Sequence, residues 1–332
     1  MDWRSKLQVL SCAAVFSAIC VTVGFAQDLK PIKMRLAYTA GGVDAPFFVA
    51  LGKGYFKEEG LNVEILDGNG STGTIQAVGN NSVEIANASL GALIQASATA
   101  GFNNLTAVFG LVQKDPSSII SLKGSGITSP KDIEGKRFAT EARNLTDGMI
   151  TAFTEANGVD FDTVKLIVTE TFQTALLRGD ADFVNVWAHP NGDQIKQFAE
   201  IEEPMLFADY GINILGTSVI ARKEWLAENG EAMRGFLRAV NKAHADVQAD
   251  PQEALDYFMQ FRPDANSEAI AHEIDVMEQY RHTDRTEGQP FGHVALEDIE
   301  QTIDLLERYS DMPAGVVTPE MIYTDAYLPQ AQ

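Results

Sequence analysis

A glycine-rich loop at residues 68–74 carries the first group of side chains in this sequence that could bind a ligand. It reads Gly-Asn-Gly-Ser-Thr-Gly-Thr, and it follows a β-rich run and opens a helical one. The first backbone amides of a helix have no partner within it, and with nearby hydroxyls they bind carboxylate, phosphate or carbonyl groups. We therefore expect Gly70, Ser71 and Thr72 to contact a ligand, with an ordinary capped turn as the alternative. The loop lacks the lysine of a nucleotide-binding P-loop, which argues against ATP.

Polar and aromatic residues also follow two other β-rich runs in the first third of the chain. Asp44 and Phe47 come after the first run, and Asn87 and Ser89 end a later one. Ligands of doubly wound sheets bind at the carboxyl ends of the strands, so we expect all four residues at a ligand site. The alternatives are helix caps for the polar residues and a core position for Phe47.

An equivalent loop follows a β-rich run in the middle of the chain. It contains Glu141, Arg143, Asn144 and Thr146. Arg143 is the one permanently charged basic residue in the candidate loops, and its guanidinium could bind a sulfonate, carboxylate or phosphate through two hydrogen bonds. A pair with Glu141, or a position in solvent, is the alternative for Arg143.

Two further pairs of residues complete the predicted ligand site. Asn185 and Trp187 follow another β-rich run. An indole in that place can stack on a planar ring while the amide binds polar ring atoms, with a core position for Trp187 as the alternative. Asp209 and Tyr210 lie where we expect the chain to cross between two lobes.

Enzyme and metal motifs are missing from the sequence. There is no Gly-x-Ser-x-Gly elbow, and His272-Glu273 lacks the second histidine of a His-Glu-x-x-His site. The remaining histidines also lack metal-ligand spacing. We therefore expect no catalytic residue, no metal site and no cofactor. The five histidines are His189, His244, His272, His282 and His293.

The elements that position these residues alternate between β-rich and helical runs from Lys33 onward, a pattern typical of α/β layers around a mainly parallel sheet. The first unit has predicted strands at residues 33–38, 62–66, 84–88 and 105–111. The second unit has predicted strands at 137–139, 164–168 and 182–186. A β-rich stretch at 211–220 and amphipathic helices at 231–247, 251–261, 267–280 and 296–309 follow.

Two sheet units followed by a helical tail predict two lobes, joined by crossings near residues 118–122 and 208–217. Such a hinge places a ligand in the cleft between the lobes. We assign residues 27–118 to the first part of lobe 1, 119–212 to lobe 2, and 213–332 to the return crossing and the helical tail. The pattern alone leaves open where the tail packs.

The N-terminal residues 1–26 have the order of a cleaved secretory signal peptide. Arg4 and Lys6 precede an apolar run that ends at small residues before Gln27. The run is shorter than the roughly 20 residues of a membrane-spanning helix. Cys12 and Cys20 both lie in this segment, so we expect a mature chain without disulfides or a cysteine nucleophile.

The charge of the chain bears on its partners. A formal net charge of −21 argues against binding to nucleic acid or to an anionic membrane. We expect a periplasmic protein that acts as a monomer.

The sequence between residues 45 and 64 resembles a known family. It contains Ala-Pro-Phe-Phe-Val-Ala and then Gly-Lys-Gly-Tyr-Phe-Lys-Glu-Glu-Gly-Leu-Asn-Val-Glu. With segments 68–71, 75–79, 129–139 and 176–182, it is similar to substrate-binding proteins of the nitrate, sulfonate, taurine and thiamine-pyrimidine importers. The resemblance implies a two-lobed, type 2 periplasmic binding fold whose C-terminal helices return to lobe 1. It also implies an ABC permease and its ATPase as partners.

Within that family the sequence looks most similar to the binders of thiamine-precursor pyrimidines, on its aromatic and polar cleft residues and segment 208–211. We therefore expect the periplasmic solute-binding component of an ATP-driven importer, with a small ring-bearing solute. The alternative solute is a sulfonate or carboxylate held by Arg143 and the glycine loop. The alternative functions are a secreted enzyme and a periplasmic sensor. Pyrimidine synthases related to this family use an iron site with clustered cysteines, which the mature chain lacks.

Overall fold

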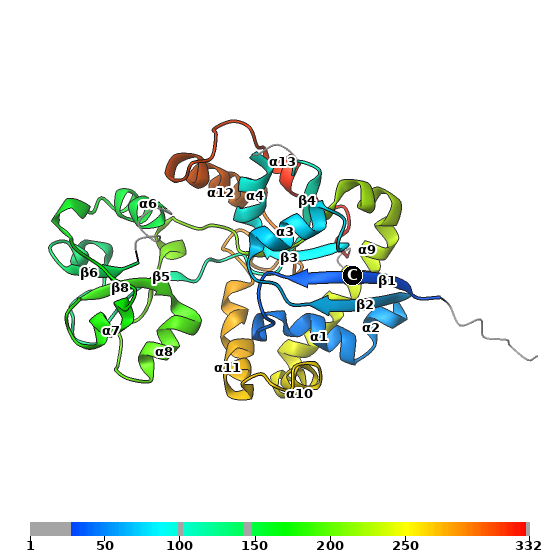
Figure 1. Cartoon of the computed structure of the whole chain (residues 1–332), viewed down its shortest axis with the longest axis horizontal. Helices are drawn as coiled ribbons and strands as arrows, with labels where there is room; N and C mark the ends of the chain where they lie inside the picture. The colour runs from blue at the N-terminus through cyan, green and yellow to red at the C-terminus, as the bar shows by residue number, and fades with distance from the viewer. Residues whose placement is uncertain (1–27, 99–101, 142–147, 330–332) are drawn as a thin grey trace, which may run out of the picture.

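The computed structural model describes residues 28–98, 102–141 and 148–329, and these residues form two lobes of unequal size (Figure 1). Lobe 1 contains a five-stranded sheet of order β2-β1-β3-β10-β4. In this sheet β1 runs parallel to β2 and β3, whereas β10 runs antiparallel to β3 and β4. The strands are β1 (Lys30–Leu36), β2 (Leu61–Leu66), β3 (Ile85–Ser89), β4 (Leu105–Gly110) and β10 (Thr217–Arg222).

Lobe 2 contains a second five-stranded sheet, of order β7-β6-β8-β5-β9. Here β6 runs parallel to β7 and β8, and β5 runs antiparallel to β8 and β9. The strands are β5 (Ser117–Ser121), β6 (Arg137–Thr140), β7 (Lys165–Val168), β8 (Phe183–Trp187) and β9 (Met205–Leu206).

The chain passes between the lobes twice, at residues 111–116 and 207–216. The expected first crossing at residues 118–122 is wrong, because residues 117–121 form β5 inside the sheet of lobe 2. Ser117 already pairs with Trp187, so the boundary of lobe 1 lies before residue 118. On the way back, Thr217 pairs with Ser89 at the end of β3.

Alternation of apolar residues explains the strands that face solvent on one side. In β1 the side chains of Ile32, Met34 and Leu36 are buried, and the residues between them are more exposed. This period of two residues is that of a strand with one buried face. Strand β4 is buried along its whole length, and its sequence is apolar except for Thr106.

The C-terminal helices return to lobe 1 and cover its sheet, as the family resemblance implied. Helix α1 packs against α9 and α10, with ring centroids 6.2 Å apart for Phe47 and Phe236 and 4.8 Å apart for Phe48 and Phe258. Helix α12 contacts α4 of lobe 1 and α6 (Met149–Ala156) of lobe 2. The helices of lobe 1 are α1 (Ala45–Gly52), α2 (Tyr55–Glu58), α3 (Ser71–Gly79), α4 (Leu90–Ala98), α9 (Lys223–Ala249), α10 (Pro251–Phe261), α11 (Ser267–Met277), α12 (Leu296–Tyr309) and α13 (Pro319–Ile322).

The helices of lobe 2 are α6 (Met149–Ala156), α7 (Phe172–Leu177) and α8 (Asp193–Lys196). They pack on the two faces of the lobe 2 sheet (Figure 1). In the part of the chain that the structure describes, no helix has both the length and the apolar character needed to cross a bilayer.

Candidate functional site

The strand ends that carry the predicted ligand residues lie at the edges where the two lobes meet. In lobe 1, Asn87 and Ser89 end β3 beside Thr217, the residue at which the chain returns from lobe 2. In lobe 2, Trp187 ends β8 beside Ser117, the residue at which the chain enters that lobe. Because both edges adjoin the crossings, they face each other across the space between the lobes (Figure 1).

A cleft of about 780 Å³ lies between lobe 2 and helix α11 of lobe 1. Lobe 2 contributes α8 and η4 (Ala188–Gly192), the segment that directly follows Trp187. The volume is in the range of small-molecule sites. Most of the lining residues have polar or charged side chains, among them His189, Asp193, Gln197, Glu268, His272 and Glu273.

Asp44 is the central residue of a buried polar network in lobe 1. Its Oδ2 accepts the Gly41 amide at 3.1 Å, and its Oδ1 accepts the Asn87 side-chain amide at 2.9 Å. Burial raises the pKa of Asp44 to about 7, and the nearby Glu273 carboxylate acts in the same direction. Exposed fractions of 5% for Asp44 and 2% for Asn87 show that both side chains are buried in this conformation. That they contact a solute stays a prediction.

Two residues of the C-terminal helical region complete this network. Glu273 of α11 accepts the Gly42 amide at 2.6 Å, and burial raises the pKa of its carboxyl. The guanidinium of Arg281 is 1% exposed and donates to the carbonyls of Leu111 and Val43, each at 3.0 Å. Arg281 therefore ties the loop after β1 to the start of the first crossing.

The glycine loop lies against the end of β1, as its place between β2 and α3 requires. A Cβ on Gly68 would come within 2.1 Å of the Leu36 carbonyl oxygen, so only glycine fits there. The Gly70 amide donates to the Ala37 carbonyl at 2.6 Å, and the Ser71 hydroxyl accepts the Ser89 amide at 3.1 Å. These bonds fix the loop at the lobe edge.

Side chains beside this loop differ in what they offer a solute. Thr72 is exposed, whereas the Ser89 hydroxyl accepts the Ala92 amide at 3.3 Å and caps α4, which is the alternative expected for Ser89. Tyr38 follows β1 and is 60% exposed, and its carbonyl accepts the Gly68 amide at 3.1 Å. Tyr38 was not among the predicted ligand residues, because the sequence pattern made it the last residue of the first strand.

In lobe 2, Trp187 is 49% exposed, so its indole is not a core side chain. Asn185 is partly buried and donates to the Ser118 carbonyl at 3.1 Å. Glu141 follows β6, the parallel neighbour of β8, and is also partly buried. Three predicted residues of the same loop, Arg143, Asn144 and Thr146, lie outside the described residues, as does the predicted signal peptide.

Three other predicted ligand residues make contacts within the protein. Phe47 is fully buried in the core of lobe 1, because α1 lies between the sheet and helices α9 and α10. Asp209 forms an ion pair with Lys114, 2.5 Å apart, which joins the second crossing to the first. Tyr210 is partly buried and packs edge-on against Phe153 of the lobe 2 core, with ring centroids 5.8 Å apart.

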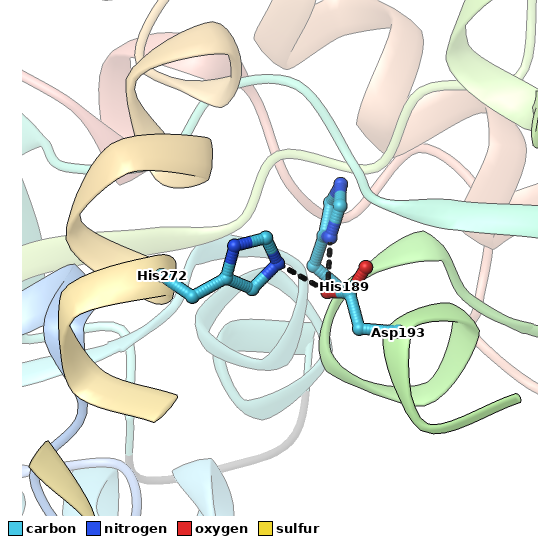
Figure 2. A group of neighbouring side chains, drawn as sticks. All are labelled: His189, Asp193 and His272. Carbon is cyan, nitrogen blue, oxygen red and sulfur yellow. Dashed lines mark hydrogen bonds and ion pairs between the residues drawn. The ribbon is translucent and has the colours of Figure 1, made fainter. Parts of the chain in front are cut away.

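The cleft also brings together a cluster that sequence pattern did not reveal. His189 and Asp193 of lobe 2 meet His272 of α11 (Figure 2). Sequence spacing relates His189 to Asp193 as residues four apart, but nothing local connects either of them to His272.

Two α/β lobes joined by two crossings, with a cleft between them and C-terminal helices on the first lobe, define the periplasmic binding protein fold. The chain belongs to the family described as NMT1/THI5 like, whose model matches residues 43–254.

Relatives by sequence include both binding proteins and enzymes. The chain is 24% identical to the formylaminopyrimidine-binding protein of Halalkalibacterium halodurans, over 95% of this chain and 97% of that protein. It is 28% identical to a 4-amino-5-hydroxymethyl-2-methylpyrimidine phosphate synthase of Aspergillus parasiticus, over 66% of this chain and 67% of that enzyme.

Solved structures agree on the fold. The periplasmic aliphatic sulphonate binding protein SsuA of Escherichia coli matches with a TM-score of 0.66 at 15% identity, over 90% of this chain and 99% of that one. The periplasmic nitrate-binding protein NrtA of Synechocystis matches with a TM-score of 0.61 at 14% identity, over 90% and 87%.

Proposed function

We propose that this chain is the solute-binding component of an ATP-driven importer, and that it binds a small pyrimidine-class ring in the periplasm. The observation that carries the proposal is the half-exposed indole of Trp187 on the edge of lobe 2 that faces lobe 1. A large aromatic ring left in solvent at a cleft edge gains contact area when a planar ring stacks on it.

The opposite edge offers a second aromatic surface. Tyr38 is 60% exposed and follows β1 on the lobe 1 edge. A solute that contacts both rings binds the closed arrangement of the lobes more tightly than the open one, and so shifts the hinge equilibrium toward closure. Closure is the change that an importer would recognise.

Polar groups near the two rings suit a nitrogen heterocycle. Asn185 and Glu141 lie on the lobe 2 edge, and Ser71 and Thr72 lie on the glycine loop of lobe 1. Amide, carboxylate and hydroxyl groups can pair with the ring nitrogens and amino substituents of a pyrimidine. The relative named as a formylaminopyrimidine-binding protein, which aligns with almost the whole chain, supports this choice of solute class.

Isothermal titration calorimetry with a panel of solutes tests the proposal. The panel contains formylaminopyrimidine, 4-amino-5-hydroxymethyl-2-methylpyrimidine, riboflavin, an alkanesulfonate and nitrate. We expect a pyrimidine to bind and to raise the melting temperature. Strong binding of the sulfonate with none of the pyrimidines would contradict the proposed solute and favour the anion alternative.

The variant Trp187→Ala tests the stacking surface. Stacking of a base on an aromatic side chain contributes about 1–3 kcal/mol, so the Kd for the pyrimidine should rise about 5- to 150-fold. Leu166→Ala is the matched control, since Leu166 is 48% exposed on the edge strand β7 of the same lobe. Equal Kd values for Trp187→Ala and the control would remove the observation on which the proposal rests.

Recovery of the solute separates a binding protein from an enzyme. After prolonged incubation, mass spectrometry should find the bound pyrimidine unchanged. A chemically changed pyrimidine would contradict the binding-protein proposal and favour an enzyme. An importer role further predicts that genes for a permease and an ATPase lie beside the gene for this chain, whereas a receptor gene there would favour a periplasmic sensor.

A further inference from the structure

Three side chains with metal-binding atoms meet between the lobes. His189 and Asp193 come from lobe 2, and His272 comes from α11 of lobe 1 (Figure 2). Nδ1 of His189 lies 2.5 Å from Oδ2 of Asp193, and Nε2 of His272 lies 2.9 Å from the same oxygen. One ligand atom from each residue lies within 4.8 Å of the other two.

We propose that this cluster binds a divalent metal ion of the zinc class, which joins lobe 1 to lobe 2. Two imidazoles and one carboxylate are a ligand set that Zn²⁺ prefers, with the fourth position left for water or another molecule. With metal–ligand bonds of about 2.1 Å in a tetrahedron, ligand atoms lie about 3.4 Å apart. The two contacts with Asp193 must therefore widen by less than about 1 Å. The two imidazole nitrogens lie within 4.8 Å of each other, so rotation of the side chains must bring them at most about 1.4 Å closer.

Burial and charge also favour a cation at this place. The side chains of His189 and Asp193 are 12% and 17% exposed, so a metal ion there would be shielded from bulk water on the lobe 2 side. Glu268 and Glu273 line the same cleft and add negative charge. The opposing charge is Lys196, whose Nζ lies 3.5 Å from Oδ1 of Asp193, the oxygen that the histidines do not contact.

The cluster is divided between the lobes, and this division gives the ion a conformational role. Opening of the cleft would carry His272 away from the other two ligands and leave an incomplete site. The ion should therefore bind the closed arrangement more tightly and shift the hinge equilibrium toward it. This inference concerns a second ligand and does not depend on which solute the cleft binds.

Without a metal, Asp193 would accept a hydrogen bond from each imidazole, and the bond from His272 would connect the two lobes at the cleft without an ion. Zinc titration of chelator-treated, solute-free protein by calorimetry separates the two cases. We expect one zinc ion per chain. The variant His272→Gln should raise the Kd at least about tenfold, as loss of even an outer-sphere partner of a metal ligand commonly does. His272 is half-exposed on α11, so this change should leave the fold intact.

The control His293→Gln removes a histidine that lies outside the cluster, and its Kd should match that of the unchanged protein. Small-angle X-ray scattering gives a second readout. Zinc should reduce the radius of gyration of the unchanged protein and of His293→Gln, but not of His272→Gln. No stoichiometric zinc binding, or equal binding by His272→Gln, would overturn the proposal.

Discussion

Replacement of Asp44 by asparagine should change how the stability of the protein depends on pH. The Asp44 carboxyl is 5% exposed, and burial raises its pKa from the ordinary 3.8 to about 7. Between these two values the folded protein keeps a proton that the unfolded chain releases. The free energy of unfolding therefore decreases as the pH rises through this window, and the loss is complete above the pKa of the folded state.

The size of the effect follows from the shift. One pKa unit corresponds to about 1.4 kcal/mol. With a shift of roughly three units, the contribution of Asp44 makes the free energy of unfolding about 4 kcal/mol lower at pH 8 than at pH 4. Asparagine cannot ionise and escapes this loss. Its oxygen can still accept from Gly41 or Asn87. Its amide can donate to Oδ1 of Asn87, a buried atom without a hydrogen-bond partner among the described residues.

Urea denaturation at half-unit steps from pH 5 to pH 8 measures the effect. The stability of Asp44→Asn relative to the unchanged protein should increase steadily with pH up to about 7 and then level off. Glu64→Gln is the control, because it removes an exposed carboxylate from β2 of the same lobe. Parallel pH profiles for Asp44→Asn and the unchanged protein would mean that Asp44 is already ionised in the fold and that burial does not keep it neutral.

Two further substitutions test the supports of the site. Phe47→Ala should lower the free energy of unfolding by about 3–5 kcal/mol, because the side chain is fully buried beside Phe236, and a loss below 1 kcal/mol by urea denaturation would contradict its core position. Arg281→Lys should cost about 3 kcal/mol in the same assay, because one ammonium group cannot replace both guanidinium bonds to the carbonyls of Leu111 and Val43. Unchanged stability of that variant would show that these bonds do not hold the first crossing.

Local pattern was sufficient for the parts of the fold that depend on neighbouring residues. A β-rich run predicted a strand at residues 33–38, which β1 (Lys30–Leu36) overlaps, and the glycines of residues 68–74 predicted a loop between a strand and a helix. Segment 118–122 was mistaken for a crossing. Most of it lies in β5, which pairs with β8 and β9, and the Ser118 hydroxyl donates to the Val186 carbonyl of β8 at 2.8 Å.

Residues of one chemical type were harder to place. Phe47 and Trp187 are both large aromatics near strand ends, yet one is fully buried and the other half-exposed. The difference comes from α9 and α10, which cover α1 and begin more than 170 residues further along the chain. The sequence pattern left open where the C-terminal helices pack. For the same reason it could not predict that His272 contacts Asp193.

The contacts of α12 indicate which way the cleft opens. Figure 1 shows α6 and α12 at the top of the junction between the lobes and α8 and α11 at the bottom. At the top, Tyr309 of α12 donates to Glu155 of α6 at 2.7 Å, and Gln301 donates to the Gly211 carbonyl of the second crossing at 2.9 Å.

These bonds, with the Lys114–Asp209 pair between the crossings, join the lobes on the side opposite the cleft. On the lobe 1 side the cleft wall is held by Glu273 and Arg281, both bonded to the loop after β1. Rotation of lobe 2 about the α12 side would therefore open the molecule between α8 and α11. That rotation would separate Asp193 from His272 before it disturbed the bonds of α12, and this is the pair on which the proposed metal ion would act.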